Sequence, residues 1–405
     1  MRNKTMISLL LALCLMFSIA AGLAEQPVQT EGIVIPVLDD LKKFEIPDND
    51  AMKLLKDMKC GWNLGNTFDA YAGYDRFSPG TNMETSWVGV RTTRELIAAV
   101  HEAGFNTIRM PVSWHNHVDE NDVIDPEWMF RVRQVADWAL EEGMYVIVNV
   151  HHDNDVKYFY PDPVHMKRSR AYLTSVWSQM AEAFKDCDEH LILESMNEPR
   201  LVGTPYEWNW NSGVSECRLA AAYINELNQI FVDTVRATGG NNATRYLAVP
   251  AYAGSPWNAV DQLFRLPEDT ADNRIIVEAH AYTPYNFALN IESPDTTFDL
   301  EKDQGKKSEI TSFLNNLYNR FVRNGIPVMM DEFGALDKGG NMQDRVNFTA
   351  FYVATATARN IPCVWWDNHN FTGGGERFGI IRRDTLEWAC PDIALAIQEY
   401  CLKDR

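Results

Sequence analysis

Two glutamates in distinctive segments are the first candidates for chemistry. Glu198 follows an asparagine and precedes a proline, and Glu332 precedes a phenylalanine and a glycine. Each lies at the end of a short apolar run of the kind that forms a buried strand. Two facing carboxyl groups can work together, because one donates a proton while the other, ionised, attacks carbon. Cleavage of a glycosidic bond needs such a pair, and strands on opposite sides of a small barrel can hold it at about 5–5.5 Å, the separation that gives retention of configuration.

Other polar residues stand at the ends of neighbouring apolar runs and fit the same chemistry. Arg109 is expected to keep Glu332 ionised through its positive charge, and Tyr282 to donate a hydrogen bond to the same carboxylate. His280 is expected to tune Glu198. A buried arginine or tyrosine taken alone is more often structural, so the argument depends on their shared position at strand ends.

Sugar-binding side chains are expected around this pair. Asn197 can hydrogen-bond the sugar 2-hydroxyl, a contact that strengthens in the transition state. Trp365 and Trp366 are consecutive, and because strand residues alternate between faces, only one can line the site; we expect Trp366. Core packing is as consistent as sugar stacking with each remaining aromatic candidate in a loop, namely Trp87, Tyr158, Trp208, Trp210, Trp257 and Phe371.

The elements that position these residues alternate along the chain. Eight short apolar runs predict buried parallel strands: Lys59–Leu64, Phe105–Pro111, Tyr145–Val150, Leu191–Met196, Tyr246–Pro250, Ile275–Ala281, Pro327–Asp331 and Pro362–Asp367. Amphipathic stretches between them predict helices over Arg91–Ala103, Glu127–Glu142, Arg170–Lys185, Arg218–Thr238, Lys307–Asn324 and Asn341–Arg359. Eight such units predict an α/β fold, a single-domain (β/α)8 TIM barrel whose strand ends carry the site. No Gly-x-Gly-x-x-Gly turn follows the first strand to favour an open sheet.

Composition limits the partners. The formal net charge is −19, which disfavours nucleic acid and is compatible with a neutral polysaccharide. The seven cysteines are scattered, without a Cys-x-x-Cys pair. After Cys14 is removed, we expect mostly buried free thiols among the other six, with one or two disulfides remaining an alternative in an exported protein.

The amino terminus resembles an export signal. Arg2 and Lys4 precede an apolar run, and small residues follow before Glu25. This pattern predicts a signal peptide over residues 1–24, which is removed on secretion; a membrane anchor is the alternative, but the apolar run is short for a bilayer. Residues 25–49 are expected to form an extended leader, and residues 50–405 the catalytic domain. The mature protein is expected to be an extracellular monomer outside the membrane.

Seven segments in order resemble glycoside hydrolase family 5, and most closely its bacterial endoglucanase subfamily 4. The resemblance covers about residue 50 to residue 400 and rests on Gly61–Thr67, Ile108–Trp114, Asn149–Asp153, Glu194–Arg200, His280–Asn286, Asp331–Ala335 and Trp365–Asn368. It implies a retaining double displacement with Glu198 as acid/base and Glu332 as nucleophile, and no metal or cofactor. The family's remaining site residues correspond to Arg109, His151, Asn197, His280, Tyr282 and Trp366, with His152 as a further sugar contact.

Two positions depart from the family pattern. Asp331 stands where many relatives carry a small residue, and we expect it to point away from the pocket. His369 stands where glycine is common, and we expect it to alter a subsite. The implied substrates are cellulose, mixed-linkage glucan and xyloglucan, with a xyloglucan-specific endoglucanase or a β-mannanase of the same family as the alternative.

Two other classes of function compete with this interpretation. A metal-dependent barrel hydrolase would draw its ligands from His115, His117, His151, His152, His280 and Asp367. That reading leaves both glutamates without a role, and loss of activity in a chelator would favour it. A catalytically inactive glycan-binding barrel would be expected to lack one glutamate, whereas both are present.

Overall fold

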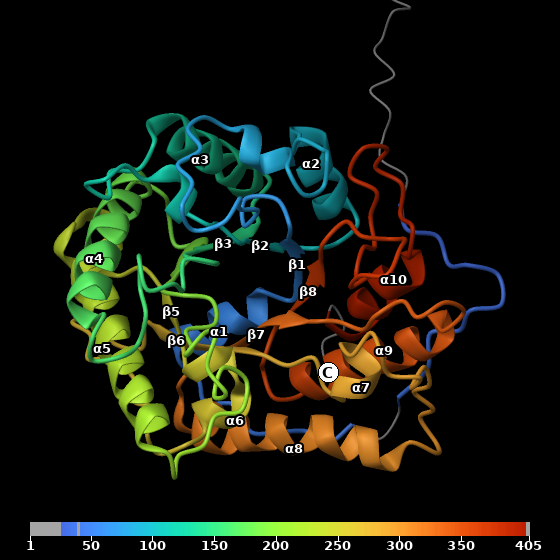
Figure 1. The fold of residues 1–405 in the computed structure, drawn as a ribbon. Coiled ribbons are helices and arrows are strands. Elements are labelled where there is room, and N and C mark those ends of the chain that lie inside the picture. The colour runs from blue at the N-terminus through green and yellow to red at the C-terminus, as the bar shows by residue number, and fades with distance from the viewer. Residues whose placement is uncertain (1–25, 39–40, 402–405) are drawn as a thin grey trace, which may run out of the picture.

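The computed structural model describes residues 26–38 and 41–401, so the predicted signal peptide lies outside the described residues. Eight parallel strands close into a barrel in sequence order, β1 pairing with β2 and with β8. The helices surround this barrel (Figure 1). The predicted fold is therefore confirmed. The strands are β1 (Cys60–Leu64), β2 (Thr107–Met110), β3 (Tyr145–Asn149), β4 (Leu191–Glu194), β5 (Leu247–Pro250), β6 (Ile275–His280), β7 (Val328–Phe333) and β8 (Cys363–Asp367).

Two of the helices that flank the early strands begin at a residue whose side chain caps them. Thr93 accepts a hydrogen bond from the backbone N–H of Leu96, and Asp125 caps the helix that starts with a proline at its first position. In the described part of the chain, no helix combines the length and apolarity that a membrane crossing requires. The helices are α1 (Asp50–Asp57), α2 (Arg94–Glu102), α3 (Pro126–Glu141), α4 (Met166–Ala183), α5 (Ser215–Ala237), α6 (Pro256–Ala259), α7 (Tyr285–Ala288), α8 (Gln304–Arg320), α9 (Met342–Thr357) and α10 (Pro391–Cys401).

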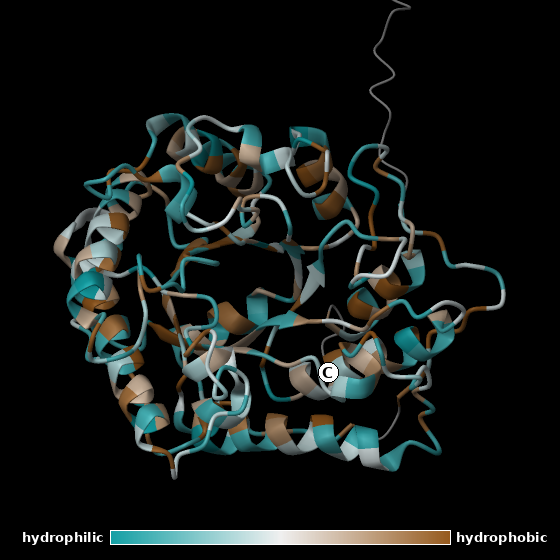
Figure 2. Ribbon diagram, in the orientation of Figure 1, coloured by the Kyte–Doolittle hydropathy of each residue, from teal (hydrophilic) through white to brown (hydrophobic). Residues whose placement is uncertain are grey.

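Burial on both faces explains why the sequences of the strands are continuous apolar runs. Every residue of β1 to β8 is buried, because one face of each strand fills the barrel and the other lies under helices. The helices carry hydrophobic and hydrophilic residues side by side (Figure 2), as expected for elements with one buried face. The charged and amide groups inside the barrel are therefore exceptions that need partners.

Strand β7 contains an irregularity that matters for the site. Its register with β6 shifts, so that Ala279 pairs with Met330 but His280 pairs with Glu332. Asp331 is the extra residue, and a second register shift follows on the β8 side. A bulge of this kind breaks the alternation of side chains, so consecutive residues can both face the barrel interior.

The leader lies along the outside of the barrel. The backbone N–H of Thr30 donates to Asp392, at 2.9 Å. Further along, Phe44 packs edge-on against Tyr318, with ring centroids 4.7 Å apart, and lies under the guanidinium of Arg359. These contacts attach the leader to α8, to the end of α9 and to α10.

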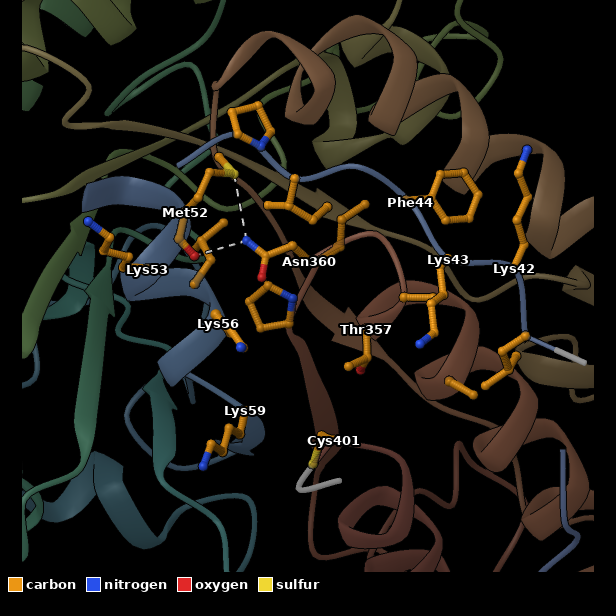
Figure 3. A pocket seen from close by; sticks show the side chains of 18 of the residues that line it. Lys42, Lys43, Phe44, Met52, Lys53, Lys56, Lys59, Thr357, Asn360 and Cys401 are labelled. Carbon is orange, nitrogen blue, oxygen red and sulfur yellow. Dashed lines mark hydrogen bonds between the residues drawn. The ribbon is translucent and has the colours of Figure 1, made fainter. Parts of the chain in front are cut away.

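A cavity of about 720 Å³ lies at the opposite end of the barrel from Glu198 and Glu332. It is bounded by the leader, α1 and the segment between α9 and β8 (Figure 3). Asn360 donates to the backbone oxygen of Met52 across it. Apolar and polar side chains both line it, and the lining includes five lysines, namely Lys42, Lys43, Lys53, Lys56 and Lys59. The cavity therefore has no connection with the carboxyl pair.

Cys60, at the start of β1, forms a disulfide with Cys401, at the end of α10. The other four described cysteines are buried free thiols: Cys187, Cys217, Cys363 and Cys390. The expectation of mostly free thiols agrees with this, and the alternative of one disulfide is also realised.

Replacing Cys60 and Cys401 by serine should lower the free energy of unfolding by about 2–4 kcal/mol, because the bridge closes a long loop and restricts the unfolded chain. Denaturant unfolding of the oxidised protein and of the double variant measures the difference. Because the bridge lies at the opposite end of the barrel from Glu198 and Glu332, kcat for any substrate on which these residues act should stay unchanged at a temperature where both proteins are folded. A large fall in kcat there would contradict this.

Candidate active site

The two glutamates meet across the mouth of the barrel. Glu198 lies four residues beyond the end of β4, and Glu332 lies in β7. One carboxylate oxygen of each lies within 4.8 Å of the other, and a ring nitrogen of His280 lies within the same distance of both. Glu332 is 5% exposed, so its carboxyl opens only to this pocket. The spacing leaves room for a sugar carbon above Glu332 but not for a water layer between the two groups.

Arg109 is the centre of a buried hydrogen-bond network. Its Nε and Nη2 donate to the two oxygens of Glu194 at 2.6 and 2.7 Å. Its Nη1 donates to Glu332 at 2.6 Å and to Asn63 at 3.1 Å. Its Nη2 also donates to Asn197 at 2.8 Å. A bidentate guanidinium–carboxylate pair is rigid, so Glu194 fixes Arg109 and Arg109 in turn fixes the nucleophile candidate.

Glu332 receives one donor at each oxygen. Arg109 occupies Oε1, and the Tyr282 hydroxyl donates to Oε2 at 3.0 Å. Burial and the charge of Glu332 raise the pKa of Tyr282 well above its usual value, so the phenol stays a donor. Both contacts expected for Glu332 are present.

Glu198 is held by His280. The Nδ1 atom of His280 lies 2.9 Å from Oε1 of Glu198 and 3.6 Å from Oε2 of Glu332. Burial alone would lower the pKa of His280, but the charges of Glu332 and Asp331 outweigh it and raise the pKa well above the usual value. Burial raises the pKa of Glu198, but the hydrogen bond from His280 and the charge of Arg200 outweigh it, and the net shift is downward. His280 thus stays cationic and stabilises the carboxylate form of Glu198.

His151 is prepared to donate to a ligand. Burial, and then the charges of His152 and Arg109, lower its pKa well below the usual value, so its ring is neutral. The Asn149 amide is oriented by the backbone N–H of Val112, and its nitrogen lies 3.1 Å from Nδ1 of His151. Nδ1 is therefore the acceptor and Nε2 carries the proton.

Of the two consecutive tryptophans, the structure places Trp366 at the site. Its ring lies parallel to that of His151, with centroids 5.9 Å apart. Trp365 is completely buried in the main core, and its indole donates to the backbone oxygen of Phe378. The alternation expected for a strand accounts for this division.

His152 belongs to an aromatic cluster beside the pocket. Its ring lies 5.3 Å from that of Tyr71 and 6.0 Å from that of Trp87. Burial and the nearby His115 lower the pKa of His152 to about 4, so its ring is neutral at pH 7. Tyr71 and Tyr74, which were not predicted from the sequence, lie in the loop after β1 with their rings stacked 5.4 Å apart. Their proximity to the mouth depends on loop conformation, which periodicity does not predict.

The remaining aromatic candidates divide into two groups. Trp208 is 61% exposed and lies over the guanidinium of Arg200, which is itself 3.6 Å from Glu198. It therefore extends the site on the Glu198 side. Trp257, in contrast, packs on Phe313 of α8 and so contributes to helix packing. The others also have ring partners: Trp210 with Tyr252, Tyr158 with Tyr172, and Phe371 with His369.

The expectation for Asp331 was wrong in an important respect. Because β7 is bulged, the carboxyl of Asp331 lies beneath the pocket, fully buried, 3.4 Å from His280 and 3.6 Å from Arg109.

His369 is the other residue that departs from the family pattern. It adopts a φ of 54° and packs on Phe371. That left-handed conformation accounts for the glycine common at this position in the family.

Several residues of the site carried no clear signal in the sequence. Glu194, Asn63 and Asn149 are fully buried and hold Arg109 or His151. Glu376, in the loop after β8, lies close enough to the pair that burial and the charges of Glu332 and Glu198 raise its pKa. For Glu194, Asn63 and Asn149, the only sequence signal is an amide or acid within an apolar run. Glu376 has no such signal, because its position near the pair depends on the conformation of a loop.

The residues that a metal-dependent hydrolase would use as ligands do not come together at one site in the described part of the chain. Nδ1 of His115 lies 2.5 Å from Asp153, and His117 stacks on Trp128. In residues 26–38 and 41–401, three groups of side chains have three metal-binding atoms within 4.8 Å, and none includes His115, His117 or Asp367. The groups are Asp69, His151 and His152; Glu198, His280 and Glu332; and Glu278, His280 and Asp331.

Comparisons with known proteins agree with this site. A family model described as cellulase (glycosyl hydrolase family 5) matches residues 72–372. Endoglucanase A of Ruminococcus albus is 40% identical over 368 residues, which cover 90% of this chain and 96% of that protein. A family 5 lichenase from a Caldicellulosiruptor species superposes with a TM-score of 0.89 at 48% identity, covering 91% of this chain and all of that one. A broad-specificity subfamily 4 endoglucanase from Ruminococcus champanellensis, with bound cellotriose, superposes with a TM-score of 0.80 at 43% identity. The match covers 87% of this chain and 99% of that one. The chain belongs to glycosyl hydrolase family 5.

Proposed function

We propose that this protein is an endo-β-1,4-glucanase that hydrolyses cellulose and related β-glucans with retention of configuration, with Glu198 as acid/base and Glu332 as nucleophile. The observation that carries the proposal is the carboxyl pair, whose oxygens come within 4.8 Å of each other at the carboxyl ends of β4 and β7. Family membership and the endoglucanase and lichenase relatives support the reaction and the substrate class.

In the first step, Glu332 attacks the anomeric carbon while Glu198 protonates the departing oxygen. Arg109 and Tyr282 bind one oxygen of Glu332 each, so both hold the carboxylate in place for attack. Asn197 hydrogen-bonds the sugar 2-hydroxyl, and Arg109 fixes its amide so that the nitrogen is left to donate. The bond from sugar to leaving group breaks, and the sugar becomes an ester of Glu332.

In the second step, Glu198 acts as a base. It takes a proton from water, and the water oxygen attacks the anomeric carbon from the face the leaving group has left. His280 favours this half of the reaction because its hydrogen bond stabilises the carboxylate form of Glu198. Esterification removes the charge of Glu332, which further lowers the affinity of Glu198 for a proton.

A glucan chain is uncharged, and its sugar faces are partly apolar. Trp366, Trp87 and Trp208 lie beside His151, His152 and Arg200, respectively, and provide flat surfaces for such faces. Neutral His151 and His152 add hydrogen-bonding groups without charge. The similarity to a lichenase makes mixed-linkage glucan a substrate to test beside cellulose.

We also propose that the protein is secreted and acts as a monomer. The secretion proposal rests on the export signal in residues 1–24, which lie outside the described part of the chain. Sizing of the purified protein tests the second point, and amino-terminal sequencing of protein recovered from culture medium tests the first.

Hydrolysis of a polysaccharide panel should release short oligosaccharides from carboxymethyl cellulose and mixed-linkage glucan, with a rapid fall in viscosity. An endo-acting enzyme cuts internal bonds, so viscosity falls before much reducing sugar appears. Viscometry together with product sizing measures both. Exclusive cleavage of xyloglucan or mannan, with cellulose and lichenan untouched, would contradict the proposed substrate class.

The first product released should be the β-anomer. Two inversions at one carbon restore the starting configuration, and the close spacing of Glu198 and Glu332 favours a direct attack by Glu332. Proton NMR of a fresh cello-oligosaccharide digest follows the anomers before they equilibrate. Appearance of the α-anomer first would mean that water attacks directly, and the assigned role of Glu332 would be wrong.

A further inference from the structure

Two buried acids lie directly beneath His280. Glu278, two residues earlier on β6, has an oxygen 3.4 Å from Nε2 of His280, and Asp331 of β7 has an oxygen at the same distance. Both side chains are completely buried. Neither carboxyl has a hydrogen-bond partner at either oxygen, and Nε2 of His280 has none. One oxygen of each acid and Nε2 lie within 4.8 Å of one another.

Arg109, the nearest arginine, makes no hydrogen bond to this pair. Arg109 lies 3.6 Å from Asp331, but its donors are directed to Glu194, Glu332 and amide oxygens. Two ionised carboxylates at this depth would repel each other and lack solvent, which is costly unless one takes up a proton. Burial, and then the charge of Asp331, raise the pKa of Glu278 well above its usual value. Burial, and then the charge of Glu194, raise the pKa of Asp331 to about 7.

We propose that Glu278 and Asp331 share one proton beneath His280 and act together as positioning residues, holding His280 protonated and directed at Glu198. The shared proton gives each acid the partner it lacks, and the remaining negative charge pairs with the imidazolium. His280 then donates from Nδ1 to Glu198 and from Nε2 to the acid pair, so its ring is held at both ends. The inference deepens the proposed function, because it concerns the group that sets the proton affinity of Glu198.

The charge of the pair has a definite effect on the groups around it. A negative charge stabilises the protonated form of every neighbour, so the pair raises the proton affinity of His280 and of Glu198 together. Loss of that charge should shift the alkaline limb of the pH–rate profile to lower pH.

The other charged or titratable groups that surround His280 and the pair come from five strands and the loops that follow them. They are Arg109 of β2, His151 after β3, Glu194 of β4, Arg200 after β4, Tyr282 after β6 and Glu332 of β7.

Imidazole nitrogen NMR of His280 tests the proposal without any hydrolysis assay, so its result is separate from that of the substrate tests. In the double variant Glu278→Gln/Asp331→Asn, both acids become neutral amides of the same shape. The pKa of His280 should fall by about one unit or more, which is about tenfold in proton affinity. The alkaline limb of kcat/KM should move in the same direction.

The single variants are the matched controls. Glu278→Gln mimics the protonated acid and keeps the charge on Asp331, so His280 should titrate close to its position in the unmodified protein. In Asp331→Asn, Glu278 takes over the charge, and the shift should be less than half of that in the double variant. Such non-additivity is the signature of sharing. An Asp331→Asn shift as large as that of the double variant, or no shift in the double variant, would overturn the proposal.

Two measurements on the unmodified protein keep the proposal testable if the double variant does not fold. Carboxyl-carbon NMR should find one of the two acids still protonated above pH 7, and both ionised there would contradict it. Elemental analysis should find no stoichiometric divalent metal. A bound metal that is lost from Asp331→Asn would make Glu278, His280 and Asp331 a metal centre instead, because these ligand types suit such an ion.

Discussion

Replacing Glu332 by glutamine should abolish hydrolysis of every substrate, with a loss on the order of 10⁶-fold, as is typical when the nucleophile of a covalent mechanism is removed. An amide cannot form the sugar ester, and no other described carboxylate lies on the same side of the pocket with Arg109 and Tyr282 as partners. The amide oxygen can still accept from Arg109 and its nitrogen can donate to the Tyr282 oxygen, so the fold should be preserved. Turnover of mixed-linkage glucan and of an aryl cellobioside measures the loss.

Labelling of the unmodified protein is the companion experiment. A 2-deoxy-2-fluoro cellobioside with a good leaving group forms the ester quickly and releases it slowly, so the intermediate accumulates. Peptide mapping should find the sugar on Glu332 alone. A label on Glu198 would reverse the two roles, and comparable aryl-glycoside turnover by the Glu332→Gln variant would remove Glu332 from the mechanism.

Replacing Glu198 by glutamine should divide substrates according to their leaving groups. Hydrolysis of natural glucans should fall by about 10²–10⁴-fold, because a sugar alkoxide leaves poorly without a proton. Formation of the sugar ester from an activated aryl glycoside should stay near its normal rate, because that leaving group needs little protonation. Rapid-mixing measurement of the aryl burst against steady-state glucan hydrolysis separates the two effects.

Azide provides the second arm of this experiment. Release of the sugar from Glu332 also needs Glu198, as a base, but azide attacks without one and should restore aryl-glycoside turnover in the variant. Glu207→Gln is a suitable control, since Glu207 also pairs with Arg200 but does not belong to the group formed by Glu198, His280 and Glu332. That variant should keep near-normal activity on both substrate types. An equal loss on natural and activated substrates, without azide rescue, would mean that Glu198 is not the acid.

The barrel and the proximity of Glu198 and Glu332 were predictable because both rest on strong local patterns. Continuous burial of parallel strands produces apolar runs, and the closing of eight such strands brings their carboxyl ends together. Once the strands were assigned, the convergence of Glu198 and Glu332 followed from topology alone. The division between Trp365 and Trp366 followed from the two-residue period of a strand.

The features that were not predictable depend on departures from those patterns. The bulge in β7 turns Asp331 inward beside Glu332, whereas simple alternation places it outside. The pairing of Cys60 with Cys401 requires knowing that α10 ends beneath β1. Glu376 and Tyr71 reach the pocket through loops, whose conformations no periodicity encodes.

The position of that disulfide determines how the enzyme can be tethered. Cys401 is bonded to the first residue of β1, at the amino ends of the strands, while Glu198 and Glu332 lie at the carboxyl ends. A linker or solid support attached just beyond Cys401 would therefore hold the molecule by the amino ends of the strands, with the mouth of the barrel directed outward. Immobilisation on a bead, or fusion to another module at that point, should leave access to long polymers unimpaired.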